Sequence, residues 1–177
     1  YNSIPSPGMA VKRNCLEQIL PLDTSICQMQ DYQMHIKLLL ANEHALINEH
    51  LVNYRMVGGS SGISGRSPVC TKREILETKK LMDSFLEIKD VNLLTKIFPD
   101  ELAEYDNLTD ETIPYFLGKM ALLSNLNSKK DWGYRTIMDF IATQENFDLL
   151  NKLYGFTFKE YINLANLCVW SNILSYG

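Results

Sequence analysis

A run of glycine and serine at residues 57–68, "VGGSSGISGRSP", divides this chain into two parts with different sequence patterns. Glycine, serine and the closing proline favour a loop and interrupt helices and strands. The residues before the run mix short strand-like and helical patterns, whereas those after it are helical. We therefore expect an α+β fold that is mainly helical, with one domain at residues 1–66 and an all-α helical domain at residues 67–177.

Composition excludes several classes of protein. Hydrophobic residues make up 46% of the chain and charged residues 21%, which is typical of a globular protein. The net charge is -4 and the chain has no basic stripe that would neutralise a nucleic-acid backbone, so we expect no nucleic acid as a partner. The four cysteines form no C-x-x-C pair, and we expect them to be reduced thiols in a cytoplasmic protein.

The first part contains two strand-like patterns and two helical ones. "GMAVKR" at 8–13 predicts a short strand, and the helix after it is expected to end at Pro21. From Asp31 a longer helix begins, with apolar residues around most of its circumference. Residues 45–54 alternate between two faces and predict a second strand.

The second part carries helical spacing near 90–98, 110–125, 131–142, 144–154 and 158–175. Thr71 with Glu74, and Thr157 with Glu160, have the spacing of a capping box, in which two side chains satisfy the free N–H groups at a helix start. Gly155 is placed to end the helix at 144–154.

Asp31 has two interpretations that are compatible with each other. An aspartate at a helix start accepts backbone hydrogen bonds and is stabilised by the helix dipole. The same carboxylate can project into a cleft and act as a general base. Beside it, Gln30 is either an ordinary surface glutamine or a group that orients a substrate hydroxyl.

The glycine-serine run and the two residues that end the second predicted strand are candidates for binding phosphate. Arg55, after Tyr54, can pair two N–H groups with phosphate oxygens or form a structural salt bridge. The run offers backbone N–H groups, hydroxyls such as Ser60 and Ser61, and Arg66. It lacks the order G-x-x-x-x-G-K-[ST], and a flexible linker has the same composition.

A metal site is not predicted from the histidines. "EHALINEH" repeats Glu-His, but on a strand His44 and His50 would lie about 20 Å apart, too far to share one ion. Ordinary solvated histidines account for this pattern.

The segment "QDYQMHIKLLL...ALINEHLVNYR" resembles the acceptor-side half of the bacterial family 2 glycosyltransferases, which have the GT-A fold. In that family, an acidic or amide residue, an Asp and an aromatic begin a helix, as Gln30-Asp31-Tyr32 does here. A strand ending in Tyr-Arg and a flexible loop follow, matched here by Tyr54-Arg55 and "MVGGSSGISG". The resemblance covers residues 1 to about 66.

The resemblance implies transfer of a sugar from a nucleotide-sugar donor to an acceptor hydroxyl, usually with inversion, in polysaccharide or glycoconjugate synthesis. Asp31 would take the proton of a glycan or lipid-linked acceptor. Gln30 would contact the substrate, and Tyr54, Arg55, Ser60, Ser61 and Arg66 would lie near the donor's diphosphate.

Two departures from the family bear on activity. Met56 and Val57 stand where many members carry a histidine after Tyr-Arg, so no metal ligand is assigned there. The nucleotide-binding half and its Asp-x-Asp motif are missing, and no D-x-D occurs in the 177 residues. We therefore expect a C-terminal fragment that is inactive alone. The full-length enzyme is expected to use Mg²⁺ or Mn²⁺, with none bound to this fragment.

The helical domain is compatible with several roles: it could shape the acceptor site, form a homodimer or contact a membrane surface. The expected location is cytoplasmic, free or peripheral at the inner face of the membrane. The alternative to a glycosyltransferase is a non-catalytic helical interaction module, in which Asp31 is only a helix cap and the glycine-serine run only a linker.

Overall fold

The computed structural model describes residues 6–53 and 67–168. The chain divides into two compact units, residues 1–84 and 85–177. The helix that follows the glycine-serine run therefore belongs to the first unit. The mainly helical character predicted from the sequence is confirmed, because every regular element in the described residues is a helix.

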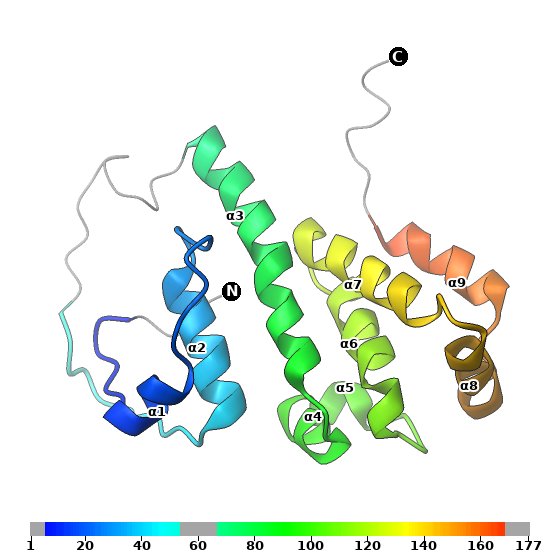
Figure 1. The fold of residues 1–177 in the computed structure, drawn as a ribbon, viewed down its shortest axis with the longest axis horizontal. Coiled ribbons are helices and arrows are strands. Elements are labelled where there is room, and N and C mark those ends of the chain that lie inside the picture. The colour runs from blue at the N-terminus through cyan, green and yellow to red at the C-terminus, as the bar shows by residue number, and fades with distance from the viewer. Residues whose placement is uncertain (1–5, 54–66, 169–177) are drawn as a thin grey trace. The chain divides into compact units, whose positions relative to one another are not determined.

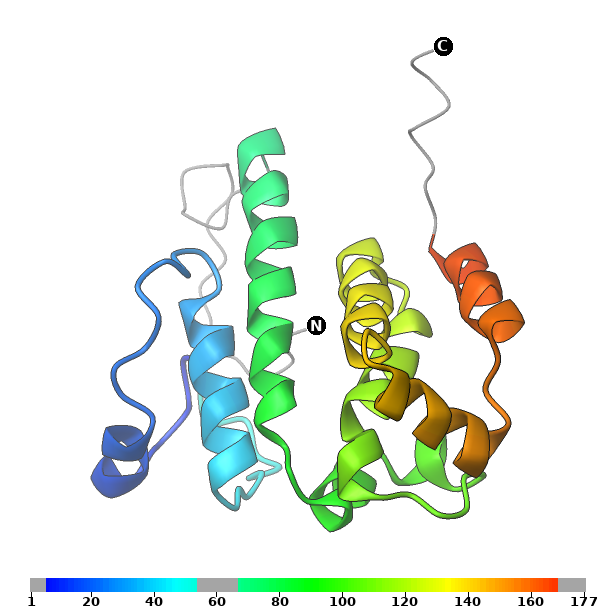
Figure 2. The same ribbon diagram turned by 45° about the vertical axis from the view of Figure 1, so that its right-hand side comes forward.

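In its described residues, 6–53 and 67–84, the first unit contains three α-helices, α1 (Arg13–Gln18), α2 (Gln30–Ala41) and α3 (Pro68–Met82). In both views α2 and α3 lie side by side (Figure 1, Figure 2). The side chains buried in this unit include apolar and polar ones: Ile19, Ile26, Gln33, His35, Ile36, Leu38, Glu77, Thr78 and Leu81. Two of the polar members, Gln33 and Glu77, fix a loop between α1 and α2, as described below.

The two strands predicted at 8–13 and 45–54 are wrong over the residues that the structure describes. Residues 43–53 have no regular secondary structure, and Arg13 already begins α1. A strand requires a neighbouring strand to pair its N–H and C=O groups, and the described residues contain none. The apolar side chains of this segment are exposed instead, Leu46 to 90% and Ile47 to 65%.

The start of α3 also differs from the prediction. Ser67 is the N-cap residue, and its Oγ accepts a hydrogen bond from the N–H of Cys70. Pro68 follows as the first helical residue, where its missing N–H removes no hydrogen bond and its fixed φ suits the helix. Thr71 and Glu74 consequently lie inside α3 and do not begin it.

The second unit is built from short helices. After a 3₁₀ turn at Asp83–Glu87 that joins the units come α4 (Val91–Ile97), α5 (Pro99–Leu102), a 3₁₀ turn at Asp110–Thr112, α6 (Ile113–Leu122), α7 (Asn127–Phe140), α8 (Gln144–Tyr154), α9 (Phe158–Leu164) and a 3₁₀ turn at Ala165–Leu167. The predicted helices are confirmed, although the one expected at 158–175 is regular only to Leu167 within the described residues.

α6 and α7 approach each other closely at two glycines, Gly118 of α6 and Gly133 of α7. A Cβ atom added to Gly133 would stand 2.5 Å from the carbonyl oxygen of Gly118, and one added to Gly118 would stand 2.6 Å from Cγ1 of Ile137. Both distances are too short for a side chain. The absence of Cβ atoms therefore lets the two backbones touch at the centre of this unit's core, beside the fully buried Trp132.

The end of α8 and the start of α9 match the sequence predictions. Gly155 ends α8 in the left-handed conformation, with φ of 66°, which glycine adopts without strain. Thr157 and Glu160 form the predicted capping box: the Glu160 carboxylate accepts the N–H of Thr157, and the Thr157 hydroxyl accepts the N–H of Glu160. Both predictions are confirmed.

Candidate active site at the start of α2

Asp31 lies in the first turn of α2 and is half-buried. Met29 is the N-cap residue and provides no side-chain cap, so Asp31 is the second residue of the helix. Its Oδ1 accepts the N–H of Tyr32 at 2.8 Å, and its Oδ2 accepts the hydroxyl of Ser6 at 3.2 Å. A carboxylate in this position is stabilised by the partial positive charge of the helix N-terminus.

The residues immediately before α2 are held by a carboxylate from α3. Glu77 accepts the N–H groups of three successive residues: Oε1 accepts that of Cys27 at 3.2 Å, and Oε2 accepts those of Gln28 and Met29, each at 2.9 Å. The thiol of Cys27 donates to the same carboxylate at 3.1 Å. Hydrogen bonds to an ionised acceptor are stronger than those between neutral groups. We call this arrangement of Glu77 with residues 27–29 the clasp.

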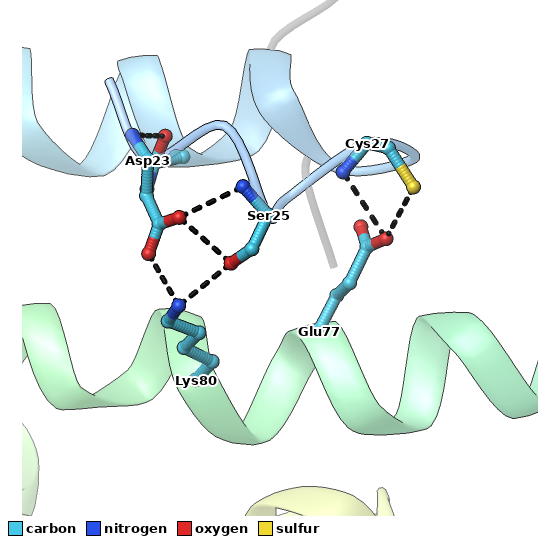
Figure 3. A network of polar contacts seen from close by, with 6 residues as sticks. Asp23, Ser25, Cys27, Glu77 and Lys80 are labelled. Carbon is cyan, nitrogen blue, oxygen red and sulfur yellow. Dashed lines mark hydrogen bonds and ion pairs between the residues drawn. The ribbon is translucent and has the colours of Figure 1, made fainter. Parts of the chain in front are cut away.

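The other end of the same loop is held by a second set of contacts (Figure 3). Lys80, one turn after Glu77 on the same face of α3, forms an ion pair with Asp23 and donates to the hydroxyl of Ser25 at 2.6 Å. The buried Gln33 of α2 accepts the N–H of Asp23 at 3.0 Å. Residues 23–29 are therefore fixed at both ends before the chain enters α2.

The clasp changes the acidity of both its members. Burial raises the pKa of Glu77, but the hydrogen bonds from the Cys27 thiol and from the N–H groups of residues 27–29 outweigh it, so the net pKa lies below the ordinary 4.5. The hydrogen bond to Glu77, with burial and the Glu77 charge, raises the pKa of the Cys27 thiol, against the opposing charge of Arg73. Glu77 is thus a permanent anion near neutral pH, and Cys27 is a thiol donor with little nucleophilic character.

The Asp23 carboxyl is also kept ionised. Hydrogen bonds from Lys80 and from the side chain and backbone of Ser25 hold its pKa well below the usual range. Asp23 therefore remains a structural anion, and the charge on Lys80 is taken up by that anion. The Asp23 carboxyl is therefore not poised to exchange a proton near neutral pH.

The structure describes only part of the predicted site. Gln30 is exposed at the first position of α2, next to Asp31. Tyr54, Arg55, Ser60, Ser61 and Arg66 lie outside the described residues. The structure thus gives the surroundings of Asp31, the predicted base, and of Gln30. The predicted role of the other residues in binding the diphosphate stays a prediction.

Sequence reasoning missed Glu77 and Lys80. They lie about fifty residues beyond the loop that they contact, and nothing local distinguishes Glu77 from the exposed Glu74 on the same helix. One available signal was the three-residue spacing of Glu77 and Lys80, which places an acidic and a basic side chain on one face of the helix. That spacing is common on solvated helices, so it does not by itself indicate a contact with a distant loop.

The second unit has a groove of about 280 Å³. It is lined by Tyr115, Lys119, Phe156, Glu160, Asn163, Leu164 and Leu167. The ammonium of Lys119 donates to the hydroxyl of Tyr105 at 2.7 Å and lies 4.6 Å from the centroid of that ring. Burial, with the nearby Tyr105, Glu160 and Tyr154, raises the pKa of Tyr115 well above its usual range. The groove therefore holds a neutral phenol and a lysine that contacts aromatic rings.

Residues 6–53 and 67–168 contain no group of three His, Cys, Asp or Glu side chains arranged to hold a metal ion. The same residues contain no helix that is both long enough and apolar enough to span a bilayer. None of the four cysteines, all of which lie among the described residues, forms a disulfide bond.

Comparison with known proteins gave no match to a family model, to a curated protein or to a solved structure.

Proposed function

We propose that this chain supplies the acceptor-activating part of a glycosyltransferase, which transfers a sugar from a nucleotide-sugar donor to an acceptor hydroxyl. The observation that carries the proposal is the setting of Asp31: a half-buried carboxylate in the first turn of α2, preceded by a loop held at both ends. The likeness of Gln30-Asp31-Tyr32 to the helix start of family 2 glycosyltransferases agrees with this setting.

In the proposed reaction Asp31 accepts the proton of the acceptor hydroxyl while that oxygen attacks the anomeric carbon of the donor. The leaving diphosphate departs from the opposite face of the sugar, which leads to inversion. Gln30, exposed beside Asp31, is proposed to bind the acceptor. Tyr54, Arg55 and the hydroxyls and Arg66 of the glycine-serine run are proposed to bind the diphosphate.

The donor-binding elements are proposed to lie in a nucleotide-binding half that this sequence does not contain. The resemblance places the Mg²⁺ or Mn²⁺ site there, and the described residues of this chain do not fit one. No step assigned to Asp31 passes through a metal. The 177-residue chain alone is therefore expected to be inactive with any nucleotide sugar.

A second candidate function is a non-catalytic interaction module. The observation that favours it is the exposure of Leu46, Ile47, Leu51 and Val52 in a segment without regular structure. Exposed apolar residues close together are typical of surfaces that bind another protein. In this alternative Asp31 only stabilises the helix start.

Replacing Asp31 by Asn in the full-length enzyme distinguishes the two functions. Loss of a general base lowers kcat by about 10²–10⁴-fold, because Asn cannot accept the proton. The folded structure should change little, since losing the charge of Asp31 in the first turn of α2 costs only about 0.3–1 kcal/mol. Sugar transfer is measured from the nucleoside diphosphate that is released, and stability is measured by thermal unfolding.

Gln30→Asn is the matched variant, because it changes the neighbouring exposed side chain and leaves the base in place. It is expected to raise the acceptor KM with a small change in kcat. Full transfer activity in the Asp31→Asn enzyme would refute the assignment of a base and favour the interaction module.

A further inference from the structure

We propose that Glu77 is a positioning residue for Asp31: by accepting the N–H groups of residues 27–29, it sets where α2 begins and hence where the Asp31 carboxylate stands. This inference rests on the proposed role of Asp31 as a base. It assigns to α3, a helix separated from α2 by the glycine-serine run, a part in the same site (Figure 3).

The contacts of the clasp end immediately before the proposed base. The last N–H that Glu77 accepts is that of Met29, the N-cap residue, and Asp31 follows two positions later. Met29 itself has no side-chain cap, and Glu77 accepts the N–H of Met29, the donor that the glutamate of a capping box accepts from within a helix. The start of α2 is thus fixed by a residue from another helix.

Burial strengthens this restraint. Glu77 is 6% exposed, and its two oxygens together receive three backbone N–H groups and one thiol. A buried carboxylate with this many donors has few other positions available to it. The loop cannot move relative to α3 without leaving a buried charge without its donors, which is costly.

Position matters to a base more than to a helix cap. A general base must stand within about 2.6–3.2 Å of the proton that it removes. A displacement of about 1 Å, even when caused by a change far from the reacting atoms, can lower a rate by about 10²-fold. Glu77 would therefore influence kcat through the placement of Asp31, without touching either substrate.

Lys80 provides a comparison on the same helix face. It contacts Asp23 and Ser25 at the far end of the loop, and its side chain is 53% exposed. An exposed ion pair restrains its partners weakly. If Glu77 acts by fixing the α2 start, loss of Lys80 should affect the reaction much less than loss of Glu77.

The test is steady-state kinetics of Glu77→Gln in the full-length enzyme. We expect kcat to fall by about 10–10²-fold while the donor KM stays within about twofold, because the donor's contacts are proposed to lie elsewhere. Glu77→Asp, which keeps the charge but draws the carboxylate back, should show an intermediate loss. It also provides the readout if Glu77→Gln does not fold.

Two further variants on α3 control the experiment. Glu74→Gln removes a carboxylate charge from an exposed position one turn away and should leave both kcat and the donor KM unchanged. Lys80→Gln should lower kcat less than Glu77→Gln. In the 177-residue chain, Glu77→Gln should accelerate amide hydrogen exchange at Gln28 and Met29, whereas Glu74→Gln should not.

The outcomes separate this inference from the proposed function. If Asp31→Asn abolishes transfer but Glu77→Gln and Glu77→Asp retain full kcat, the positioning role is wrong and the base assignment stands. Equal losses of kcat for Lys80→Gln and Glu77→Gln would also overturn it, because general docking of the loop would then be sufficient. If Asp31→Asn retains activity, the proposed function itself fails.

Discussion

Glu77 carries the charge on which the start of α2 depends, so its protonation should weaken the first unit. Its pKa in the folded chain lies below the ordinary 4.5, because four hydrogen bonds favour the anion over burial. A carboxyl group whose folded pKa is lowered contributes stability that is fully present above its unfolded pKa. That contribution is lost as the pH falls through the folded value.

The expected result is a stability difference between wild type and Glu77→Gln that is largest at neutral pH and shrinks below about pH 4.5. Urea unfolding between about pH 3 and 7 measures it, provided that each transition is cooperative. Asp23, whose pKa is also lowered, is present in both proteins and cancels. A difference in the free energy of unfolding between the two proteins that stays constant over this pH range would contradict the prediction.

At the scale of single residues, the sequence predicted several local conformations, although not the start of α3, and it predicted no distant contact. Gly155 and the pair Thr157–Glu160 act within one helical turn, so their spacing alone predicts their conformation. The position of Asp31 at the start of a helix is likewise a local property. The contact of Glu77 with Cys27 joins residues 50 apart, and no local pattern encodes it.

The crossing of α6 and α7 leads to a prediction at the scale of elements. Gly133→Ala places a Cβ 2.5 Å from the Gly118 carbonyl oxygen and 2.9 Å from the Ala121 Cβ. Overpacking of this kind costs about 1–3 kcal/mol. Alanine recovers about 1 kcal/mol of helix propensity, so the net effect is a smaller loss of stability. Thermal unfolding of the variant measures the balance.

A double-mutant cycle tests for crowding at the other glycine of this contact, Gly118. Gly118→Ala brings a Cβ to 2.6 Å from Cγ1 of Ile137, and Ile137→Ala removes that atom. If crowding is responsible, the double variant should be more stable than the sum of the single effects predicts. Asp139→Ala, at an exposed position of α7, should change stability little. Additive effects would show that the Ile137 side chain does not crowd the Gly118 position.

Helices and strands differed in how well the sequence predicted them. A helix satisfies its hydrogen bonds within one segment, and the segments at 91–97, 113–122 and 144–154 formed as expected. A strand depends on a partner strand for its backbone hydrogen bonds. The alternation of residues 45–54 between two faces therefore favours a strand only where a neighbouring strand is present. The described residues offer no such neighbour.

At the scale of the whole molecule, the division after Ser84 predicts that the second unit folds independently. Residues 85–177 contain their own core, including Trp132, Phe116 and Leu150, each no more than 1% exposed. Expressed alone, they should show the circular dichroism of a helical protein and a cooperative urea transition. A gradual, non-cooperative transition would show that this unit depends on residues 1–84.

The clasp connects two stretches of chain that are 50 residues apart. Lengthening a connection of this size adds little entropic cost, since each doubling of a loop costs only about 0.6 kcal/mol. Residues 43–53, exposed and without regular structure, can therefore accommodate insertions while Glu77 still reaches residues 27–29. The number of residues between α2 and α3 is consequently a poor marker of this site. A search for similar sites should allow that distance to vary and should require the buried glutamate on the second helix.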